Sequence, residues 1–536
     1  MKPLTTQAAV IGASLGGCLA AYQLARQGVD TILTSEFPWI GGQLTSQGVP
    51  PDEHRYIESF GASASYLAFR NAIRSVYRND PDFIDNSVMT EGLNPGDGWV
   101  SRLCFEPRHA EEYLRTLLAP YIESGRLQLL ERAVPVGAHR SGDCIESVTV
   151  LHGTAGNTNI EIRADYFLDG TDTGELLALL ELPYRLGKES RAEFGELQAP
   201  DQANPADQQP ITHVVALQKV PAGAERPVAT PAAYDFWRAH VLPHYGHPIF
   251  SEEIPGGEGF TRVRLPLFGE GETLDLWRYR RVVAGHNWRD ACADISLVNW
   301  AQNDFALQPL LDGKHKTEAE VLSAARELSL CLVYWLQNHA PRSSVGEPGE
   351  GFPELALAPA VLGTEDGFAQ QVYVRESRRI IGLETLHQEH IRARYDGDTQ
   401  PATFENSVGI GLYNMDIHPT CDSYMGSNAR VRPFELPLGI FIPRDARNLL
   451  PACKNISVTH LVNAATRVHP IEWLVGEVAG LLAAFCLHRG RRPHEVHVRP
   501  EFRERLQELL HDSGIPIHWP QHLHRNNEQE ATECQD

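Results

Sequence analysis

Three ionisable residues in the C-terminal part of the chain could transfer protons or bind an acidic substrate. His460, Arg467 and His469 are close together in the sequence. An imidazole titrates near neutral pH and can act as a general base, and a guanidinium can bind a carboxylate through two parallel hydrogen bonds. We expect His469 to be the base, with His460 as the second candidate. The alternatives are a packed or helix-capping imidazole at position 469 and an ion pair between Arg467 and Glu472.

The residues after His469 predict the helix that positions it. Pro470 suits a first helical turn, because its ring fixes φ and it has no N–H to lose. Gly476 and Gly480 stand one turn apart and permit the close approach of another backbone. A helix N-terminus carries free N–H groups and partial positive charge. We therefore expect an anion-stabilising helix end at Pro470 and Ile471.

A glycine-rich turn near the N-terminus predicts a second anion-binding site. The residues GASLGG at positions 12–17 follow an apolar strand predicted over 8–11. A helix predicted over 18–27 comes next, and a second strand is predicted over 31–33. In this order of elements, the pyrophosphate of a dinucleotide lies at the helix N-terminus. The opening segment therefore predicts a Rossmann-like nucleotide-binding unit.

Individual positions of this turn have distinct roles. Gly12 allows the tight turn, and Gly17 lets the helix and the strand pack closely. Ser14 stands where a glycine usually lets the backbone approach the phosphates, and its side chain is small enough for that position. Together with Leu15 and Gly16, these residues form the predicted pyrophosphate site.

An acidic residue and a double glycine follow the second predicted strand. In dinucleotide-binding folds, an acid at the end of that strand binds the adenosine ribose. The spacing from Gly12 points to Ser35, and we assign the contact to the next residue, Glu36. Gly41 and Gly42 follow shortly afterwards, within the run Trp-Ile-Gly-Gly-Gln-Leu.

Together these motifs resemble the FAD enzymes of the glutathione-reductase superfamily. The double glycine before Gln43 resembles the segment that carries the chain under the cofactor there. The pairing of Trp-Ile-Gly-Gly-Gln with the later His-Pro-Ile-Glu-Trp resembles a poorly characterised group of FAD-dependent oxidoreductases. The resemblance implies an α/β fold, with a Rossmann-like FAD-binding domain assembled from discontinuous segments and a mixed α+β substrate domain.

The same resemblance implies cofactor contacts farther along the chain. Val134 corresponds to strand-end backbone at the adenine edge, with a plain core strand as the alternative. Gly170 and Thr171 correspond to a second turn near the adenosine, with an acidic β-turn as the alternative. The helix at Pro470 corresponds to the final flavin-binding helix. Lys454 stands where many members have an aspartate, and it could bind ribityl or phosphate oxygens.

The expected domain organisation follows these motifs. Residues 1–180 and 430–490 are expected to form the FAD-binding domain, and residues 181–429 the substrate or cap domain. A C-terminal extension with a frayed tail is expected over 491–536.

The middle region and Cys453 contain weaker signals. Thr317 begins a predicted capping box ahead of a helix. The polar stretch 375–379 alternates like a strand, and it is either a substrate clamp or a surface charge ladder. The stretch 277–288 could line a pocket for an anionic or aromatic substrate. Cys453 could be a nucleophile or a covalent flavin anchor. The favoured alternative is that it is a buried small hydrophobic residue.

Composition limits the partners and the compartment. The 536 residues carry a formal net charge of −22, which argues against nucleic acid and anionic membranes as partners. No apolar run approaches the roughly 20 residues that span a bilayer, so no membrane partner is expected. The nine cysteines contain no Cys-x-x-Cys pair, which favours reduced thiols in a cytoplasmic protein. No metal site is predicted, and a homo-oligomer is compatible with the sequence.

We expect an FAD-dependent oxidoreductase, either an oxidase or a dehydrogenase, that transfers hydride from a small organic metabolite to flavin. Oxygen or another acceptor would take the electrons, because no second glycine fingerprint for NAD(P)H is found in the sequence. The alternatives are a flavin monooxygenase that uses NAD(P)H without a separate nicotinamide domain, an FAD-dependent RNA-modifying enzyme and a non-catalytic FAD-binding protein. A signal peptide is the alternative for the first residues, but its removal would delete the glycine turn.

Overall fold

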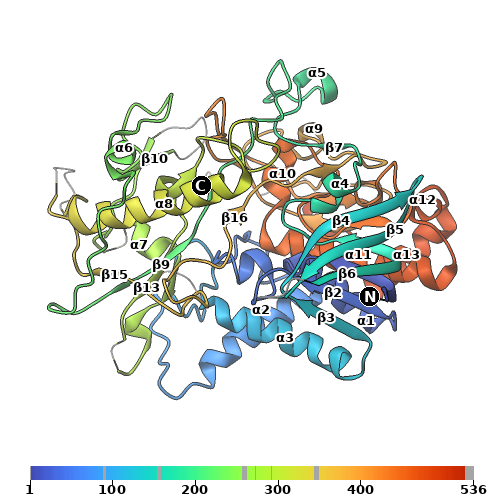
Figure 1. The fold of residues 1–536 in the computed structure, drawn as a ribbon, viewed down its shortest axis with the longest axis horizontal. Coiled ribbons are helices and arrows are strands. Elements are labelled where there is room, and N and C mark those ends of the chain that lie inside the picture. Colours follow the sequence, from blue (N-terminus) through green and yellow to red (C-terminus); the bar gives the residue numbers. More distant parts are fainter. Residues whose placement is uncertain are drawn as a thin grey trace, which may run out of the picture.

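The computed structural model describes residues 2–88, 92–153, 158–255, 262–271, 273–290, 292–342 and 349–524. Figure 1 shows the large sheet together with the N-terminus and the helices α11 (His469–Arg489), α12 (Pro493–Val498) and α13 (Pro500–Asp512) on one side of the molecule. The middle of the sequence surrounds the long helix α8 (Glu318–Asn338) on the other side. The frayed tail expected near the C-terminus falls on residues 525–536, which lie outside the described residues.

A seven-stranded sheet forms the first domain. Its order is β3-β2-β1-β6-β5-β4, and β22 also pairs with β6. Strands β1, β2, β3, β6 and β22 pair in parallel, whereas β4 and β5 extend β6 as an antiparallel meander. The strands are β1 (Leu4–Ile11), β2 (Thr31–Ser35), β3 (Leu127–Glu131), β4 (Ala133–Ser141), β5 (Cys144–His152), β6 (Thr158–Asp169) and β22 (Leu449–Pro451). This sheet confirms the α/β class and a Rossmann-like domain assembled from discontinuous segments.

Alternating side chains of β1 enter two different cores. Ala8 and Val10 belong to the core that contains helices α1 (Leu15–Arg26), α3 (Pro107–Glu123) and α11 (His469–Arg489). Ala9 and Ile11 belong to a second core, shared with the β4–β6 meander. Because side chains alternate along a strand, a continuous apolar run is needed when both faces of the sheet are covered. The predicted strand, helix and strand at the N-terminus are confirmed, with bounds that differ by a few residues.

The two helices α1 and α11 touch through their backbones. A Cβ added to Gly476 would lie 2.0 Å from the carbonyl oxygen of Gly16. A Cβ added to Gly480 would lie 2.5 Å from the carbonyl oxygen of Ala20. The predicted close approach at these two glycines is therefore confirmed, and the helix that it meets is α1.

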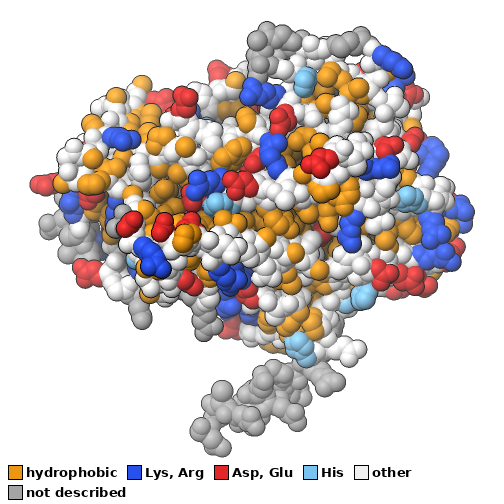
Figure 2. Space-filling view, turned by 90° about the horizontal axis from the view of Figure 1, so that it is seen from below, with side chains coloured by type: hydrophobic (Ala, Val, Ile, Leu, Met, Phe, Trp, Pro, Cys, Tyr) orange, Lys and Arg blue, Asp and Glu red, His pale blue; other side chains and the backbone are white. Residues whose placement is uncertain are grey.

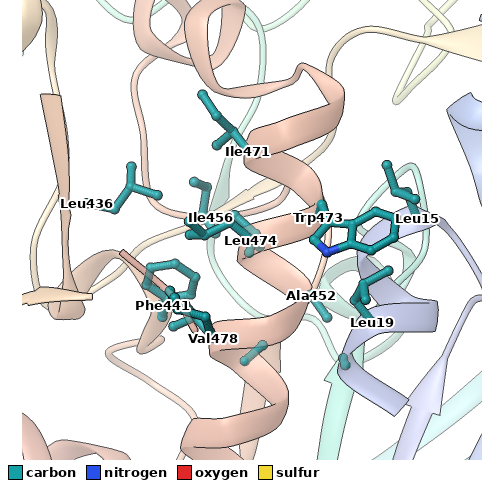
Figure 3. Close-up of a cluster of buried hydrophobic side chains, with 14 of the residues drawn as sticks. Leu15, Leu19, Leu436, Phe441, Ala452, Ile456, Ile471, Trp473, Leu474 and Val478 are labelled. Atoms are coloured by element: carbon teal, nitrogen blue, oxygen red, sulfur yellow. The ribbon is translucent and has the colours of Figure 1, made fainter. Parts of the chain in front are cut away.

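Large side chains of α11 fill the space on either side of this contact. Figure 3 shows Trp473 beside Leu15 and Leu19 of α1, and Val478 beside Phe441 on the other side of the helix. All five side chains are buried. Helix α11 is therefore enclosed between α1 and the segment that precedes β22.

This enclosure corrects one expectation about apolar runs. By length and composition, α11 is apolar enough to cross a membrane, so the expectation that no run approaches that length was wrong. Its most apolar stretch is 94% buried inside the protein. A helix that is covered on all sides needs apolar residues all round, as a membrane-spanning helix does.

The second domain is built from antiparallel sheets and α8. One sheet has the order β12-β13-β9-β15 and another the order β14-β8-β16. Helix α8 packs on β8 and β14, and its N-cap Thr317 forms the predicted capping box with Glu320. The strands are β8 (Ile211–Thr212), β9 (Val215–Lys219), β12 (Arg281–Val283), β13 (Ile295–Val298), β14 (Asp304–Phe305), β15 (Leu355–Leu357) and β16 (Tyr373–Val374). The expected mixed α+β domain is confirmed.

Shorter elements connect the two domains and cover α11. The helices are α2 (Ala64–Arg78), α4 (Glu175–Leu179), α5 (Arg191–Phe194), α6 (Tyr234–Ala239), α7 (Leu276–Tyr279), α9 (Gln388–Ile391), α10 (His460–Thr466), α12 (Pro493–Val498) and α13 (Pro500–Asp512). The strands are β7 (Tyr184–Arg185), β10 (Glu253–Pro255), β11 (Arg262–Arg264), β17 (Arg379–Ile380), β18 (Ser407–Gly411), β19 (Met415–Ile417), β20 (Ser427–Ala429) and β21 (Phe434–Pro437). Leu386 and Val408 share a core with α11. The FAD-binding domain was predicted to resume only at residue 430, after both of these residues. The domain bounds stay predictions.

Replacing Gly476 with alanine should lower the stability of the fold. The new Cβ would collide with the Gly16 carbonyl, so the helices would have to separate, and overpacking of this kind costs about 1–3 kcal/mol. Urea unfolding would measure the loss. Gly137→Ala is the matched control, because its added Cβ would have no neighbour closer than Thr149 Cβ at 3.9 Å. Equal stability of the two variants would contradict the close helix contact.

Candidate functional site

A cavity of about 390 Å³ lies at the carboxyl ends of β1, β2 and β6. Four separate segments of the first domain meet there, together with residues of the second domain. Six predicted cofactor residues line the cavity: Gly12, Ser14, Glu36, Val134, Gly170 and Thr171. The other nine do not line it: Leu15, Gly16, Gly17, Gly41, Gly42, Gln43, Lys454, Pro470 and Ile471.

Glycines allow three turns of the chain to pack closely against one another beside this cavity. A Cβ added to Gly12 would lie 2.5 Å from the carbonyl oxygen of Gly170. The Gly41 N–H donates to the carbonyl oxygen of Ala13 (2.8 Å). Gly12 and Gly41 also have positive φ angles of 99° and 105°, which favour glycine. The two sequence motifs therefore form one continuous cradle that lets backbone approach a ligand closely.

The start of α1 is capped from inside the protein. Ser14 is the N-cap, and its Oγ accepts from the Gly17 N–H (3.2 Å), which gives this serine a structural role beside its place in the cavity wall. The Gly16 N–H donates to Glu472 Oε1 (3.2 Å), and the Gln43 side-chain amide also donates to Glu472. Glu472 of α11 therefore joins the double-glycine segment to the first helix.

Glu36 follows β2 directly and faces the cavity, as the ribose prediction requires. Burial, followed by the neighbouring carboxylates of Glu318, Glu175 and Asp172, raises the pKa of Glu36 to about 7. A carboxylate at this place can accept hydrogen bonds from two adjacent ribose hydroxyls. A pKa near 7, raised first by desolvation and then by these acids, leaves the carboxyl group partly protonated at physiological pH.

Lys454 is buried among three acidic or thiol groups. Its Nζ lies 2.5 Å from Asp172 Oδ1, 3.5 Å from Glu472 Oε2 and 3.6 Å from Cys453 Sγ. Burial alone lowers the pKa of an ammonium, but the Asp172 carboxylate and its neighbours raise the pKa of Lys454 well above its ordinary value. The three partners are close enough to hold a metal ion, but the Lys454 ammonium already contacts all three.

Cys453 matches the favoured alternative of a buried small residue. Its side chain is fully buried, and burial raises the pKa of its thiol well above the ordinary value. A thiol in this state carries little thiolate, and the thiolate is the nucleophilic form.

His469 is buried, and both of its ring nitrogens bond to backbone. Nε2 donates to the Val49 carbonyl oxygen (3.0 Å), and Nδ1 accepts from the Asp52 N–H (3.1 Å). Burial lowers the pKa of His469 to about 4, so the ring is neutral. This geometry matches the packed-imidazole alternative, and proton uptake would require the ring to release Asp52.

Arg467 pairs with a carboxylate other than the one anticipated. Its guanidinium lies 3.2 Å from Asp416 Oδ2 and donates to the Tyr373 hydroxyl (2.6 Å). Glu472 instead binds Gly16 and Lys454. The ion pair suggested between Arg467 and Glu472 is therefore wrong, because the helix start turns the two side chains toward different neighbours.

His460 belongs to a separate buried network. Its backbone N–H and its Nδ1 both lie 2.8 Å from Glu189 Oε2. Glu189 also pairs with Arg379 at 2.9 Å. These contacts fix the start of α10, and His460 does not line the cavity at the glycine turns.

The polar stretch 375–379 is buried, so a surface charge ladder was the wrong interpretation. Arg375 pairs with Asp304 at 2.8 Å, and Arg379 is fully buried against Glu189. The strand expected over 375–379 is wrong, because β16 ends at Val374 and β17 begins at Arg379, and residues 375–378 connect these two short strands. Each guanidinium there needs a carboxylate, because an unpaired buried charge is costly.

Buried polar atoms without a protein partner mark a region that sequence reasoning missed. Arg375 donates to Asn299 Oδ1 (3.3 Å), and Asn463 donates to the Arg375 carbonyl oxygen (3.1 Å). The unpartnered atoms in this region are Gln43 Oε1, Gln47 Oε1 and Nε2, Asn299 Nδ2, Arg375 Nε, Asn463 Oδ1 and Arg467 Nε. Buried polar groups normally have partners, so these atoms fit a bound polar ring system. No motif groups these residues, although Gln47 lies just after the double glycine.

The glycine cradle, the ribose acid and these unpartnered atoms fit FAD. The cradle allows the close approach that a pyrophosphate needs, and Glu36 can bind the ribose. Val134 lines the same cavity, where the adenine edge was predicted. Amide and guanidinium groups suit the pyrimidine edge of a flavin, which carries several hydrogen-bonding atoms.

Replacing Glu36 with glutamine should affect stability and FAD affinity in opposite directions. The folded pKa of about 7 lies above the ordinary 4.5, so the stability that the neutral acid contributes is lost as pH rises through that value. The permanently neutral variant should therefore raise the Tm of FAD-free protein at about pH 8, with no gain at about pH 4. At about pH 8, where Glu36 is ionised, FAD should bind the variant about tenfold more weakly, because a charged hydrogen-bond acceptor is lost.

Thermal scans at both pH values and calorimetric titration with FAD would measure these effects. Glu161→Gln is the matched control, because Glu161 is an exposed carboxylate on β6 that pairs with Arg163. Unchanged FAD affinity in the Glu36 variant would remove this residue from the ribose site.

Comparison with known proteins gives one family match. The model of the family described as FAD dependent oxidoreductase matches residues 7–510, and no curated protein matches the chain. A geranylgeranyl bacteriochlorophyll reductase-like protein of Thermoplasma acidophilum is 12% identical, with TM-score 0.32, over 96% of this chain and 86% of that one. The myxobacterial chondrochloren halogenase CndH is 10% identical, with TM-score 0.33, over 99% and 89%. An L-proline dehydrogenase from P. horikoshii is 17% identical, with TM-score 0.18, over only 32% and 23%. The family match spans nearly the whole chain, which therefore belongs to the FAD dependent oxidoreductase family and has FAD as its cofactor.

Proposed function

We propose that this protein is an oxidase or dehydrogenase that removes hydride from a small organic metabolite. The observation that carries the proposal is the single cavity that unites the glycine cradle, Glu36 and the turn at Gly170. The buried polar atoms without a protein partner near the start of α11 support placing the flavin ring beside this helix end. The order of these motifs along the chain also supports membership of the glutathione-reductase-like superfamily.

The substrate would lose a hydride from carbon and a proton from its hydroxyl or amino group, which leaves a C=O or C=N bond. Bound FAD would supply the hydride acceptor, and oxygen or another acceptor would take up the two electrons. The protein must orient the donor carbon and exclude water. Arg467 is suited to orientation, because Asp416 and Tyr373 hold its guanidinium and its carbonyl oxygen accepts from Gln43 (3.1 Å).

We propose a positioning role for His469, with the role of general base as the competing prediction. Its two hydrogen bonds fix the segment from Val49 to Asp52 against the start of α11. That segment follows Gln47, whose amide atoms have no protein partner. The ring therefore fixes the position of the segment from Val49 to Asp52, which follows the double glycine in the sequence.

The surface agrees better with a small-molecule substrate than with RNA. Figure 2 shows a face on which Lys and Arg side chains are interspersed with Asp and Glu. An RNA-binding face needs a basic stripe that follows the phosphates, and the described residues drawn on this face do not form a continuous one. The overall charge of −22 points the same way.

Anaerobic reduction of the purified holoenzyme should decide the reaction class. We expect flavin absorbance at about 450 nm, and loss of that band when a hydroxylated or aminated metabolite is added without oxygen. NADPH alone should leave the band unchanged. Rapid bleaching by NADPH, with no bleaching by any metabolite, would favour a monooxygenase instead. A colourless protein that does not take up FAD would contradict the assignment altogether.

Replacing His469 with glutamine should retain FAD and slow flavin reduction by less than about tenfold, because a positioning group does not receive the proton. The Tm should fall, since one backbone hydrogen bond of the 49–52 segment would be lost. Stopped-flow reduction and thermal unfolding would measure both effects. A loss of about 10²–10⁴-fold with unchanged Tm would identify His469 as the general base.

A further inference from the structure

A second cavity, of about 630 Å³, is lined in part by Asp416, the partner of Arg467. Its wall includes Asp416 of β19, Asn428 of β20 and the two aromatic residues Tyr279 and Tyr413. Asp416 therefore has one side toward this cavity and the other toward Arg467, which directly precedes the N-cap of α11. The second cavity is thus adjacent to the helix end at which the flavin ring is proposed.

The carboxylates of this cavity are neutralised by arginines. Three pairs are Asp416 with Arg467, Asp398 with Arg394, and Asp396 with Arg430. Glu53 also lines the cavity and pairs with the buried Arg70. His54 is neutral, because burial lowers its pKa to about 4. Arg55 is the exception, because it lines the exposed rim without a carboxylate partner among the described residues. Solvent screens a charge at such a place, and the matched pairs elsewhere in the wall offer many hydrogen-bonding atoms but little net field for a charged ligand.

Asp416 is held in this wall by a histidine as well as by Arg467. His418 Nε2 lies 3.3 Å from Asp416 Oδ2, and His418 Nδ1 lies 2.5 Å from Asp304 Oδ2. Arg375 holds Asp304 in turn at 2.8 Å. The Asp416 side chain nevertheless keeps 30% of its surface exposed. A carboxylate fixed by a histidine and an arginine, with accessible surface left, is preorganised to accept hydroxyl groups.

The other groups of the wall suit the same kind of ligand. Tyr413 offers ring surface for the C–H faces of a cyclic or extended polyol, whereas the Tyr279 ring already packs against Trp99 at 4.3 Å and Arg280 at 4.8 Å. Asn428 Oδ1 is buried without a protein partner and can accept a hydrogen bond. Arg55, at the exposed rim, lies over the Tyr56 ring at 4.8 Å.

We propose that this cavity binds a neutral, polyhydroxylated substrate, with Asp416 as the acceptor for its hydroxyl groups. The inference rests on the proposed function, since a carbinol carbon can lose hydride while its hydroxyl loses a proton, which leaves a ketone or an aldehyde. Paired charges disfavour ligands with a net charge, and aromatic surface beside fixed acceptors favours sugars and cyclitols.

Calorimetry with the FAD-loaded protein tests the proposal with three matched sets of probes. Glucose, sorbitol and myo-inositol are the neutral probes, glucosamine is the cationic probe, and gluconate and glucuronate are the anionic probes. We expect at least one neutral probe to bind at least tenfold more tightly than each charged analogue. Asp416→Asn should weaken that binding at least tenfold, while the flavin spectrum stays unchanged.

Two further variants keep the test decisive. Tyr413→Leu removes the ring but no ion pair, and it should weaken neutral ligands even if the Asp416 variant folds poorly. Asp30→Asn is the matched control, because Asp30 is exposed and pairs with Arg126 at 2.5 Å, outside both cavities. It should leave binding unchanged.

The proposal and the proposed function fail in different ways. If charged probes bind as tightly as neutral ones, if no neutral probe binds, or if neither cavity variant weakens binding, the substrate class is wrong. Flavin that is still bleached by another metabolite would leave the proposed function standing. Protein without FAD, or with flavin that no metabolite reduces, would overturn the proposed function itself.

Discussion

The direct backbone contact between α1 and α11 is the constraint on which the rest of this structure depends. Gly476 and Gly480 leave no room for a side chain against Gly16 and Ala20. This contact brings the 21-residue helix α11 against α1, the first helix of the sequence. It also places Glu472 at the Gly16 N–H, so the nucleotide turn is completed by a residue from the opposite end of the chain.

Buried ion pairs form the second organising feature. The chain Arg375–Asp304–His418–Asp416–Arg467 runs from the second domain to the start of α11. Such pairs contribute little net stability, because desolvation offsets most of their attraction. Their effect is to fix geometry, since loss of one partner would leave a buried charge uncompensated. In this protein they orient Asp416, which lines the second cavity, and Arg467, which directly precedes the N-cap of α11.

Local motifs predicted the nucleotide half of the site. Gly12, Glu36 and Gly170 line one cavity because each follows a parallel strand, and the carboxyl ends of parallel strands meet at one edge of a sheet. The roles of Arg467 and His469 were not predictable in the same way. Their partners, Asp416 and the segment at Val49, are distant in the sequence and belong to no motif.

The sequence by itself determined the Rossmann-like unit, the helix start at Pro470 and the α/β class, because these depend on spacing within short segments. Only the tertiary structure decided that Arg375 is buried, that Glu472 binds Gly16 and that α11 is enclosed by protein. Hydrophobic and charge patterns indicate which kind of partner a segment requires, such as apolar side chains that exclude water or a side chain of opposite charge. The packing of the whole chain decides which partner supplies it.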